Sequence, residues 1–166
     1  MTTQQNEMHK GAKLSEDRIY RYNLFRIWDH SKPACTFIGL NPSTADEQED
    51  DPTIRRCVNF AQTWGFGRLY MVNLFAYRAT QPKDMIAAED PVGPDNNAWL
   101  QWAACNSKLI VAAWGNDGRF EKRDDEVKLL LKNHKLKCFS ITKQKQPAHP
   151  LYQKSSAQLI DFLPTE

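Results

Sequence analysis

Apolar runs alternate with amphipathic stretches along most of the chain. Five runs have the length and the β-branched or aromatic content of strands, at residues 20–28, 34–40, 68–75, 108–114 and 136–142. The last four are almost continuously apolar, which is typical of parallel strands buried on both faces of a sheet. The first alternates aromatic and polar residues, and it predicts an additional N-terminal strand or hairpin.

Helical patterns occupy the segments between and after these strands, at residues 53–64, 81–88, 94–106, 121–133 and 155–163. The first of them follows Asp51-Pro52, an N-cap residue with a proline in the first turn. Strands that alternate with helices indicate the α/β class. We therefore predict three α/β/α layers around a central, mostly parallel four-stranded sheet.

Length and composition suit one soluble domain. The chain has 166 residues, of which 41% are hydrophobic and 25% charged, an ordinary globular composition without an apolar stretch that could span a bilayer. The opening residues contain no apolar signal region. We expect a flexible N-terminus at 1–16, a single domain at 17–166, a monomeric state, a cytoplasmic location and no membrane partner.

The cysteines and the charges restrict the chemistry further. Cys35, Cys57, Cys105 and Cys138 are widely spaced, with no C-x-x-C pair, so we expect buried free thiols and neither a metal nor a cofactor. The net charge is only +2, but residues 46–51 are acidic and lysines crowd the last third of the chain. A local basic surface suits phosphates, although a solvated helix face followed by a polar loop is an equally good interpretation.

Polar residues lie at the end of each of the four almost continuously apolar strands, which are counted here from the strand at residues 34–40. They are 41–44 after the first, Asn73 and 77–78 at the second, 115–118 after the third and 142–150 after the fourth. In an open α/β sheet the ligand binds at the carboxyl ends of the strands. The pattern therefore predicts that four loops converge on one crevice.

Three polar side chains in these loops could carry chemistry. The carboxamide of Asn41 can accept a hydrogen bond from a water, unless Gly39 to Pro42 is a plain turn. Asn73 interrupts an apolar strand and offers one acceptor and two donors, which match the edge of a nucleobase, unless it bonds neighbouring backbone at a bulge. His149 lies between two prolines that stiffen its loop, unless it is merely structural. For Trp114, packing in the core is favoured over stacking on a base.

Four segments, taken in order, resemble motifs of the uracil-DNA glycosylase superfamily. They are Gly39-Leu40-Asn41-Pro42, Met71-Val72-Asn73, Ala112-Ala113-Trp114-Gly115 and His149-Pro150-Leu151. The resemblance covers about residues 34 to 152. The same stretch also resembles a family of small bacterial and phage proteins defined as a domain of unknown function, which supplies no activity.

The superfamily resemblance implies a role for each motif. Asn41 would position the water that attacks C1′ of the sugar, Asn73 would bind the extruded base, and His149 would donate to the leaving base or contact a phosphate. The substrate-binding residues would be Gly39, Leu40, Pro42, Ser43, Asn73, Tyr77, Arg78, Trp114, Gly115 and Asn116. The DNA-binding residues would be Arg55, Arg56, Lys143, Lys145, Pro150 and Tyr152.

The first motif departs from the superfamily pattern. It continues as Ser43-Thr44-Ala45-Asp46 instead of an aromatic pair, which implies a roomier pocket for a mismatched or 5-modified pyrimidine. Asn41 also stands where many members have aspartate. A nearby acid, Asp46, Asp50 or Asp51, could then activate the water, so the candidate catalytic residues are Asn41, His149, Asp46 and Asp51.

Three function classes remain open at this stage. The first is a DNA glycosylase acting on double- or single-stranded DNA. The second is a hydrolase of free nucleosides or nucleotides, which the acidic segment favours because it would repel a duplex. The third is a catalytically silent nucleic-acid-binding module, which the missing aspartate favours.

Overall fold

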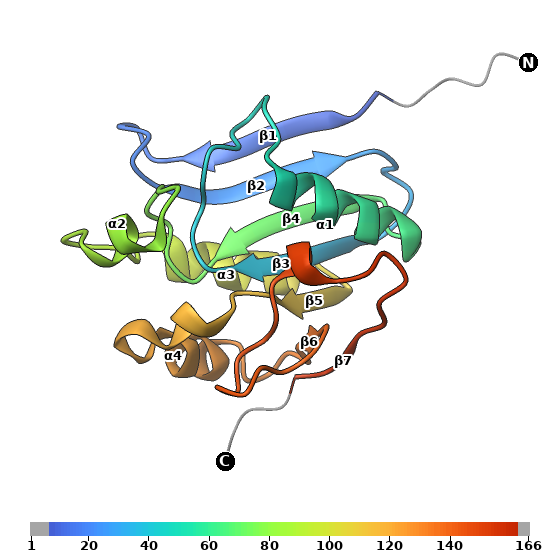
Figure 1. The fold of residues 1–166 in the computed structure, drawn as a ribbon. Helices are drawn as coiled ribbons and strands as arrows, with labels where there is room; N and C mark the ends of the chain where they lie inside the picture. The colour runs from blue at the N-terminus through green and yellow to red at the C-terminus, as the bar shows by residue number, and fades with distance from the viewer. Residues whose placement is uncertain (1–6, 163–166) are drawn as a thin grey trace, which may run out of the picture.

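A seven-stranded sheet runs through the middle of the molecule, as the computed structural model of residues 7–162 shows (Figure 1). Its strands are β1 (His9–Leu14), β2 (Arg21–Ile27), β3 (Ala34–Gly39), β4 (Arg68–Asn73), β5 (Leu109–Ala112), β6 (Lys137–Cys138) and β7 (Ile160–Asp161), in the order β1-β2-β4-β3-β5-β6-β7. The four central strands β4, β3, β5 and β6 are parallel, and β1, β2 and β7 pair antiparallel at the two edges. The predicted α/β class with a parallel four-stranded centre is confirmed.

Helices cover both faces of the sheet (Figure 1). Helix α1 (Pro52–Thr63) lies on one face, next to the short 3-10 helix η2 (Pro150–Tyr152). The other face carries α2 (Pro82–Ile86), α3 (Asn96–Cys105), the 3-10 helix η1 (Asn116–Lys122) and α4 (Arg123–Leu130). The predicted three-layer arrangement is therefore present.

Each face of the sheet has its own apolar core. Along β3, Phe37 packs with Phe60 of α1, whereas the next residue, Ile38, packs with Leu100 of α3. This alternation follows from the two-residue period of a strand. Since both faces are buried, the central strands need apolar residues at every position, which explains their continuous hydrophobic runs.

Both ends of the chain differ from the prediction. Residues 9–14 lie within the predicted flexible N-terminus, but they form β1, whose backbone pairs with β2 from His9 to Leu14. Residues 1–6 of that predicted segment lie outside the described residues. At the other end, the predicted helix 155–163 is wrong, because Ile160 and Asp161 pair with β6 and Phe162 packs its ring against Trp114. Leu163 lies outside the described residues.

The predicted strand 136–142 is also shorter than expected. Only Lys137 and Cys138 pair in the sheet, because the chain then turns back on itself. Ala148 N–H donates to Ser140 O at 2.9 Å and Thr142 N–H donates to Gln146 O at 2.8 Å. These bonds replace the sheet ladder and direct residues 146–150 toward the end of β5.

The cysteines are free thiols, of which Cys35, Cys57 and Cys138 are buried. Burial raises the pKa of the Cys57 thiol, and it raises that of Cys138 to about 11. Cys105 is exposed, contrary to expectation, because it is the last residue of α3. Within residues 7–162 no three His, Cys, Asp or Glu side chains are grouped to hold a metal ion. None of the helices in this part of the chain is both long and apolar enough to cross a membrane.

Arg26 of β2 attaches the acidic segment 46–51 to the sheet. Its buried guanidinium donates from Nε to Asp50 Oδ1 at 2.8 Å and from Nη2 to the carbonyl oxygens of Asp46 at 2.8 Å and Glu49 at 3.3 Å. Its Nη1 donates to the carbonyl oxygens of Gly11 and Phe25. A single side chain therefore holds β1, β2 and the loop that leads into α1.

We expect Arg26→Met to lower the free energy of unfolding by about 3 kcal/mol, because it leaves Asp50 and several carbonyls without their donor. Urea denaturation followed by circular dichroism measures the loss. Arg68→Met is the matched control on β4, since Arg68 is half-buried and donates to His30 O, and we expect it to cost less than about 1 kcal/mol. Equal losses in the two variants would contradict the role given to Arg26.

Candidate functional site

A cavity of about 490 Å³ lies at the carboxyl ends of β3, β4 and β5, beside the first turn of α1 and the loop that carries η2. This is the crevice that the polar strand ends predict. Its walls include the following residues singled out from the sequence: Gly39, Leu40, Asn41, Pro42, Ser43, Asp51, Asn73, Trp114, Gly115, Asn116, His149, Pro150 and Tyr152. The two candidate amides, the imidazole and one candidate acid thus share a single cavity.

The amide of Asn41 is fixed by the neighbouring loop. Its Nδ2 donates to the carbonyl oxygens of Ala79 at 2.9 Å, Pro42 at 3.1 Å and Tyr77 at 3.4 Å. Since these are all acceptors, the nitrogen must face them, and Oδ1 is the atom available to a ligand. Asn41 can therefore accept a hydrogen bond from a water in the cavity.

Asn73 lies over Gly39, and its amide depends on that glycine. A Cβ at residue 39 would lie 2.8 Å from Asn73 Oδ1 and 2.8 Å from Met71 Cε, so a side chain there would displace the amide. Asn73 is buried, and its Nδ2 has no partner among the described residues. A buried amide hydrogen without an acceptor is costly, and a ligand acceptor in the cavity would relieve that cost.

Two buried residues of the helices α3 and α4 hold the end of β4. Asn96 Nδ2 donates to the carbonyl oxygens of Asn73 at 2.9 Å and Leu74 at 3.0 Å. Arg123 Nε also donates to Leu74 O, at 2.8 Å. These bonds fix the backbone at the point where β4 delivers Asn73 to the cavity.

The loop that carries His149 is anchored at both of its ends. Buried Gln146 accepts from Trp114 Nε1 at 2.9 Å and donates to Asp124 Oδ2 at 3.0 Å. At the other end, Arg56 of α1 donates to the carbonyl oxygen of Gln153. The imidazole is thus held beside the end of β5 and the start of α1.

The protonation state of His149 follows from its contacts. Its Nδ1 accepts a hydrogen bond from Leu151 N–H at 3.2 Å, so in the neutral ring the proton is on Nε2. Burial lowers the pKa of His149 from its usual value, and the nearby Asp51 carboxylate offsets this only in part. At neutral pH the side chain is an uncharged donor through Nε2–H.

Asp51 is the candidate acid that the structure brings to the cavity. It is the N-cap of α1, and its Oδ1 accepts from Ile54 N–H at 2.9 Å. The second oxygen of a carboxylate can still accept a hydrogen from a water. Its charge also acts on two other residues of the cavity, Arg21 and His149.

Trp114 and Gly115 form part of the wall in different ways. The expected core position of Trp114 is confirmed, since its side chain is buried and its Nε1 is bonded to Gln146. Gly115 has a positive φ of 73°, a conformation that favours glycine, and a Cβ there would meet no atom within 4 Å. A ligand can therefore approach the backbone closely at this point.

Asp46, Tyr77 and Arg78 lie outside this cavity. The Asp46 carboxylate accepts from the backbone N–H groups of Gln48 and Glu49, at 2.9 and 2.8 Å, and these bonds lower its pKa. Tyr77 and Arg78 line a separate hollow at the surface. Asp46 thus shapes the acidic loop, and it does not share a cavity with Asn41 and His149.

Four of the expected DNA-binding residues also lie outside the cavity. Arg56 is committed to Gln153, and its guanidinium lies 4.9 Å from the centre of the Phe60 ring. Arg55 is exposed on α1, and Lys143 and Lys145 are exposed on the turn before Gln146. Of the expected set, only Pro150 and Tyr152 line the cavity.

Several residues of the wall were not singled out from the sequence. Ile54, Met71 and Leu151 add apolar surface and Asp117 adds a second acid. Arg21 is the unexpected member, because it is fully buried. Its strand alternates aromatic and polar residues and also contains Arg26, so the sequence offers no signal that separates the two arginines.

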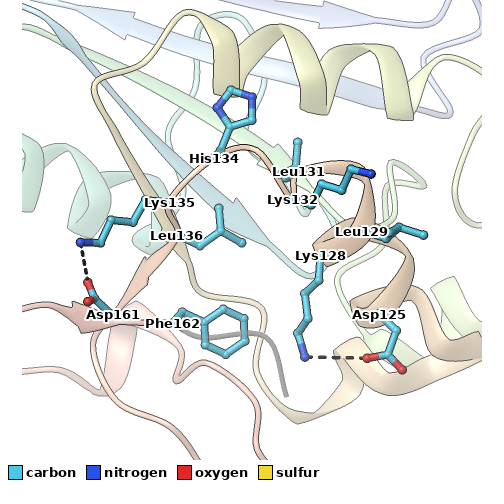
Figure 2. A pocket seen from close by; sticks show the side chains of 10 residues that line it. All are labelled: Asp125, Lys128, Leu129, Leu131, Lys132, His134, Lys135, Leu136, Asp161 and Phe162. Atoms are coloured by element: carbon cyan, nitrogen blue, oxygen red, sulfur yellow. Dashed lines mark ion pairs between the residues drawn. The ribbon is translucent and has the colours of Figure 1, made fainter. Parts of the chain in front are cut away.

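A second cavity, of about 610 Å³, lies between α4, the residues that lead into β6 and the edge strand β7 (Figure 2). Leu131, Leu136 and Phe162 contribute its apolar surface. Figure 2 shows two ion pairs in its lining, Lys128 with Asp125 at 3.8 Å and Lys135 with Asp161 at 3.5 Å. Its described lining contains His134 and two aspartates but no asparagine or glutamine, so the amide groups of the first cavity have no counterpart here.

Comparison with known proteins adds one match. Residues 21–151 match the model of a family described as "Protein of unknown function (DUF1643)". This range includes every residue of the cavity wall except Tyr152. Neither a curated protein nor a solved structure matches the chain significantly.

We expect His149 to remain neutral in mildly acidic solution. Because burial disfavours the imidazolium, protonation requires a pH below the usual histidine pKa of about 6.5. Nitrogen-15 NMR of the imidazole should show the Nε2–H tautomer at neutral pH and a titration midpoint below that value. A His149→Gln variant assigns the signal by its disappearance. A midpoint above 6.5, or an Nδ1–H tautomer, would contradict the arrangement.

Proposed function

The chain belongs to the DUF1643 family, and we propose that it is a member of the uracil-DNA glycosylase superfamily that hydrolyses the N-glycosidic bond of an extruded pyrimidine. The proposed substrate is DNA in which that pyrimidine is mismatched or carries a substituent at C5. One observation carries the proposal, namely that Asn41, Asn73, Asp51 and His149 line the same cavity at the carboxyl ends of the parallel strands. They supply an acceptor for water, a contact for the base, a carboxylate and a neutral donor.

Cleavage of the N-glycosidic bond creates negative charge on the base and positive charge on the sugar. As the bond between C1′ and the base nitrogen breaks, its electron pair moves onto the base, and the sugar becomes an oxocarbenium-like cation. The Nε2–H of His149 would donate to an oxygen of the departing base, where that negative charge develops. A water held by Asn41 Oδ1 would form the new bond to C1′ and give one of its protons to Asp51, while the departing base anion takes up a proton from solvent.

The size and the lining of the cavity support a substituted base. At about 490 Å³ it lies within the usual range of small-molecule sites, about 300–1,000 Å³. Ser43, a small half-buried residue, forms part of the wall where the superfamily pattern has an aromatic pair. A substituent at C5 therefore has room that an aromatic wall would deny.

Exposed apolar residues at the rim support a DNA partner. Next to His149, Leu151 and Tyr152 are 43% and 85% exposed. Proteins that remove a base from the stack often insert an apolar side chain into the duplex in its place. These two residues would serve that purpose at the entrance of the cavity.

A hydrolase of free nucleotides is the second candidate. It is favoured by the acidic Asp51 and Asp117 in the wall and by the commitment of Arg56 to Gln153, which leaves few cations near the entrance for a DNA backbone. Such an enzyme would use the same four side chains on a single nucleotide, which lacks the phosphates of adjacent nucleotides in a DNA strand.

The proposal is tested with oligonucleotides that contain uracil, mismatched thymine or 5-substituted pyrimidines, as duplexes and as single strands. We expect alkali-labile abasic sites at the mismatched or 5-substituted positions. Release of uracil alone would contradict the assigned specificity, and release of no base would contradict the glycosylase. Release from free nucleotides only would support the second candidate, and salt-sensitive binding without release would support a silent DNA-binding module.

Asp51→Asn separates the catalytic role of this residue from its role as a helix cap. Asparagine caps a helix about as well as aspartate, so we expect little change in stability, while the loss of the base should lower the rate of base release by a factor of about 10² or more. Asp46→Asn is the matched variant outside the cavity, and we expect it to keep most of the activity. The reverse result would return the catalytic role to Asp46.

A further inference from the structure

Three arginine side chains are fully buried, and two of them have a full set of acceptors. Arg26 donates to Asp50 and to backbone carbonyls from all three of its nitrogens. Arg123 donates to Leu74 O, Glu126 and Asn97. A buried guanidinium needs such partners, because its removal from water is costly.

Arg21 does not follow this rule. It is 2% exposed, and within the described residues its guanidinium makes one hydrogen bond, from Nη1 to Ala45 O at 3.1 Å. Its Nε is buried and has no acceptor within residues 7–162. Arg21 begins β2 beside the end of β4, where its backbone N–H donates to Ala76 O at 2.9 Å, and it lines the cavity.

Charged groups of both signs surround Arg21. The carboxylates of Asp51 and Asp46 act on its guanidinium, and so do the guanidinium groups of Arg78 and Arg26. Burial is the main reason why its pKa falls to about 10, which still leaves the side chain charged at neutral pH. Arg26 is paired with Asp50, whereas Arg21 is the one arginine or lysine among the described residues that line the cavity.

A second buried donor in the same wall also lacks an acceptor. Asn73 Nδ2 has no partner in the described part of the chain, and its residue is 1% exposed. His149 adds a third donor through Nε2–H. These three donors are complementary to a ligand group that carries acceptor oxygens.

We propose that Arg21 anchors an anion subsite of the cavity, which binds a carboxylate or phosphate group of the substrate. A guanidinium fits both groups because two of its N–H bonds can point to two oxygens of one anion. The group would be either a carboxyl on the base or the phosphate of the nucleotide. The nucleotide nature of the ligand rests on the proposed function, whereas the preference for an anion rests on Arg21.

Three matched ligands distinguish the two sources of the anion by isothermal titration calorimetry at constant ionic strength. Thymidine is the neutral reference, thymidine 5′-monophosphate adds only a phosphate, and 5-carboxy-2′-deoxyuridine replaces the methyl group with a carboxylate. We expect one anionic ligand to bind at least about tenfold more tightly than thymidine, which corresponds to about 1.4 kcal/mol. The tighter ligand identifies the source, and no preference for either anion would overturn the proposal.

Arg21→Met tests the residue itself. We expect it to abolish the preference for the anion, to leave thymidine affinity within about twofold, and not to lower the unfolding temperature of the free protein, since it removes a poorly satisfied buried charge. Arg68→Met, at the opposite end of β4, should keep the preference. If Arg21→Met kept the preference, or was destabilised as strongly as Arg26→Met, Arg21 would be structural and the proposal wrong.

The base-release assay separates this proposal from the proposed function. A preference for an anion that depends on Arg21, in a protein that releases no base, would support the subsite and refute the glycosidic chemistry. Base release without any such preference would refute the subsite and leave the glycosylase intact.

Discussion

The buried guanidinium of Arg26 is the interaction on which the rest of the structure depends. It joins the outer strands β1 and β2 to the acidic segment 46–51 through one carboxylate and four carbonyl oxygens. That segment ends at Asp51, which caps α1 and faces the cavity. Because the cap and the candidate catalytic carboxylate are the same group, the position of the helix and the geometry of the site are set together. The acidity of this loop therefore serves to satisfy a buried cation and to start a helix.

In the candidate site, two side chains likewise use one of their polar atoms to bind the scaffold. Asn41 uses its amide nitrogen on three carbonyls of the scaffold, and His149 uses Nδ1 on the backbone of its own loop. The acceptor Oδ1 of Asn41 and the donor Nε2–H of His149 therefore remain available to a ligand. Polar groups oriented in advance in this way need not reorganise when charge develops during a reaction. Gln146 and Arg56 anchor the two ends of the loop that carries His149, so they help to keep its imidazole at the cavity.

Two of the buried polar groups without a partner among the described residues lie at the cavity. Arg21 and Asn73 both line it, and both retain a buried nitrogen without an acceptor. The other fully buried arginines have complete sets of partners and lie where they hold elements together. Local departures from good packing chemistry are expected where a ligand completes the structure. The contrast between Arg21 and Arg26, five residues apart on one strand, is therefore the clearest functional signal in the molecule.

The sequence by itself determined the α/β class, the parallel centre of the sheet and the crevice at its carboxyl edge, because continuous apolar runs and the polar residues that end them are local features. It also identified Asn41, Asn73 and His149, since each is a polar exception at a strand end. Only the tertiary structure decided the edges of the sheet, because a strand such as β7 exists through pairing with a distant partner that local propensity does not encode. It also showed that Asp51, the N-cap of α1, lines the cavity and that the nearby Asp46 does not. Arg21 required the fold as well, because whether a charge within an alternating strand is solvated or buried depends on what packs against it.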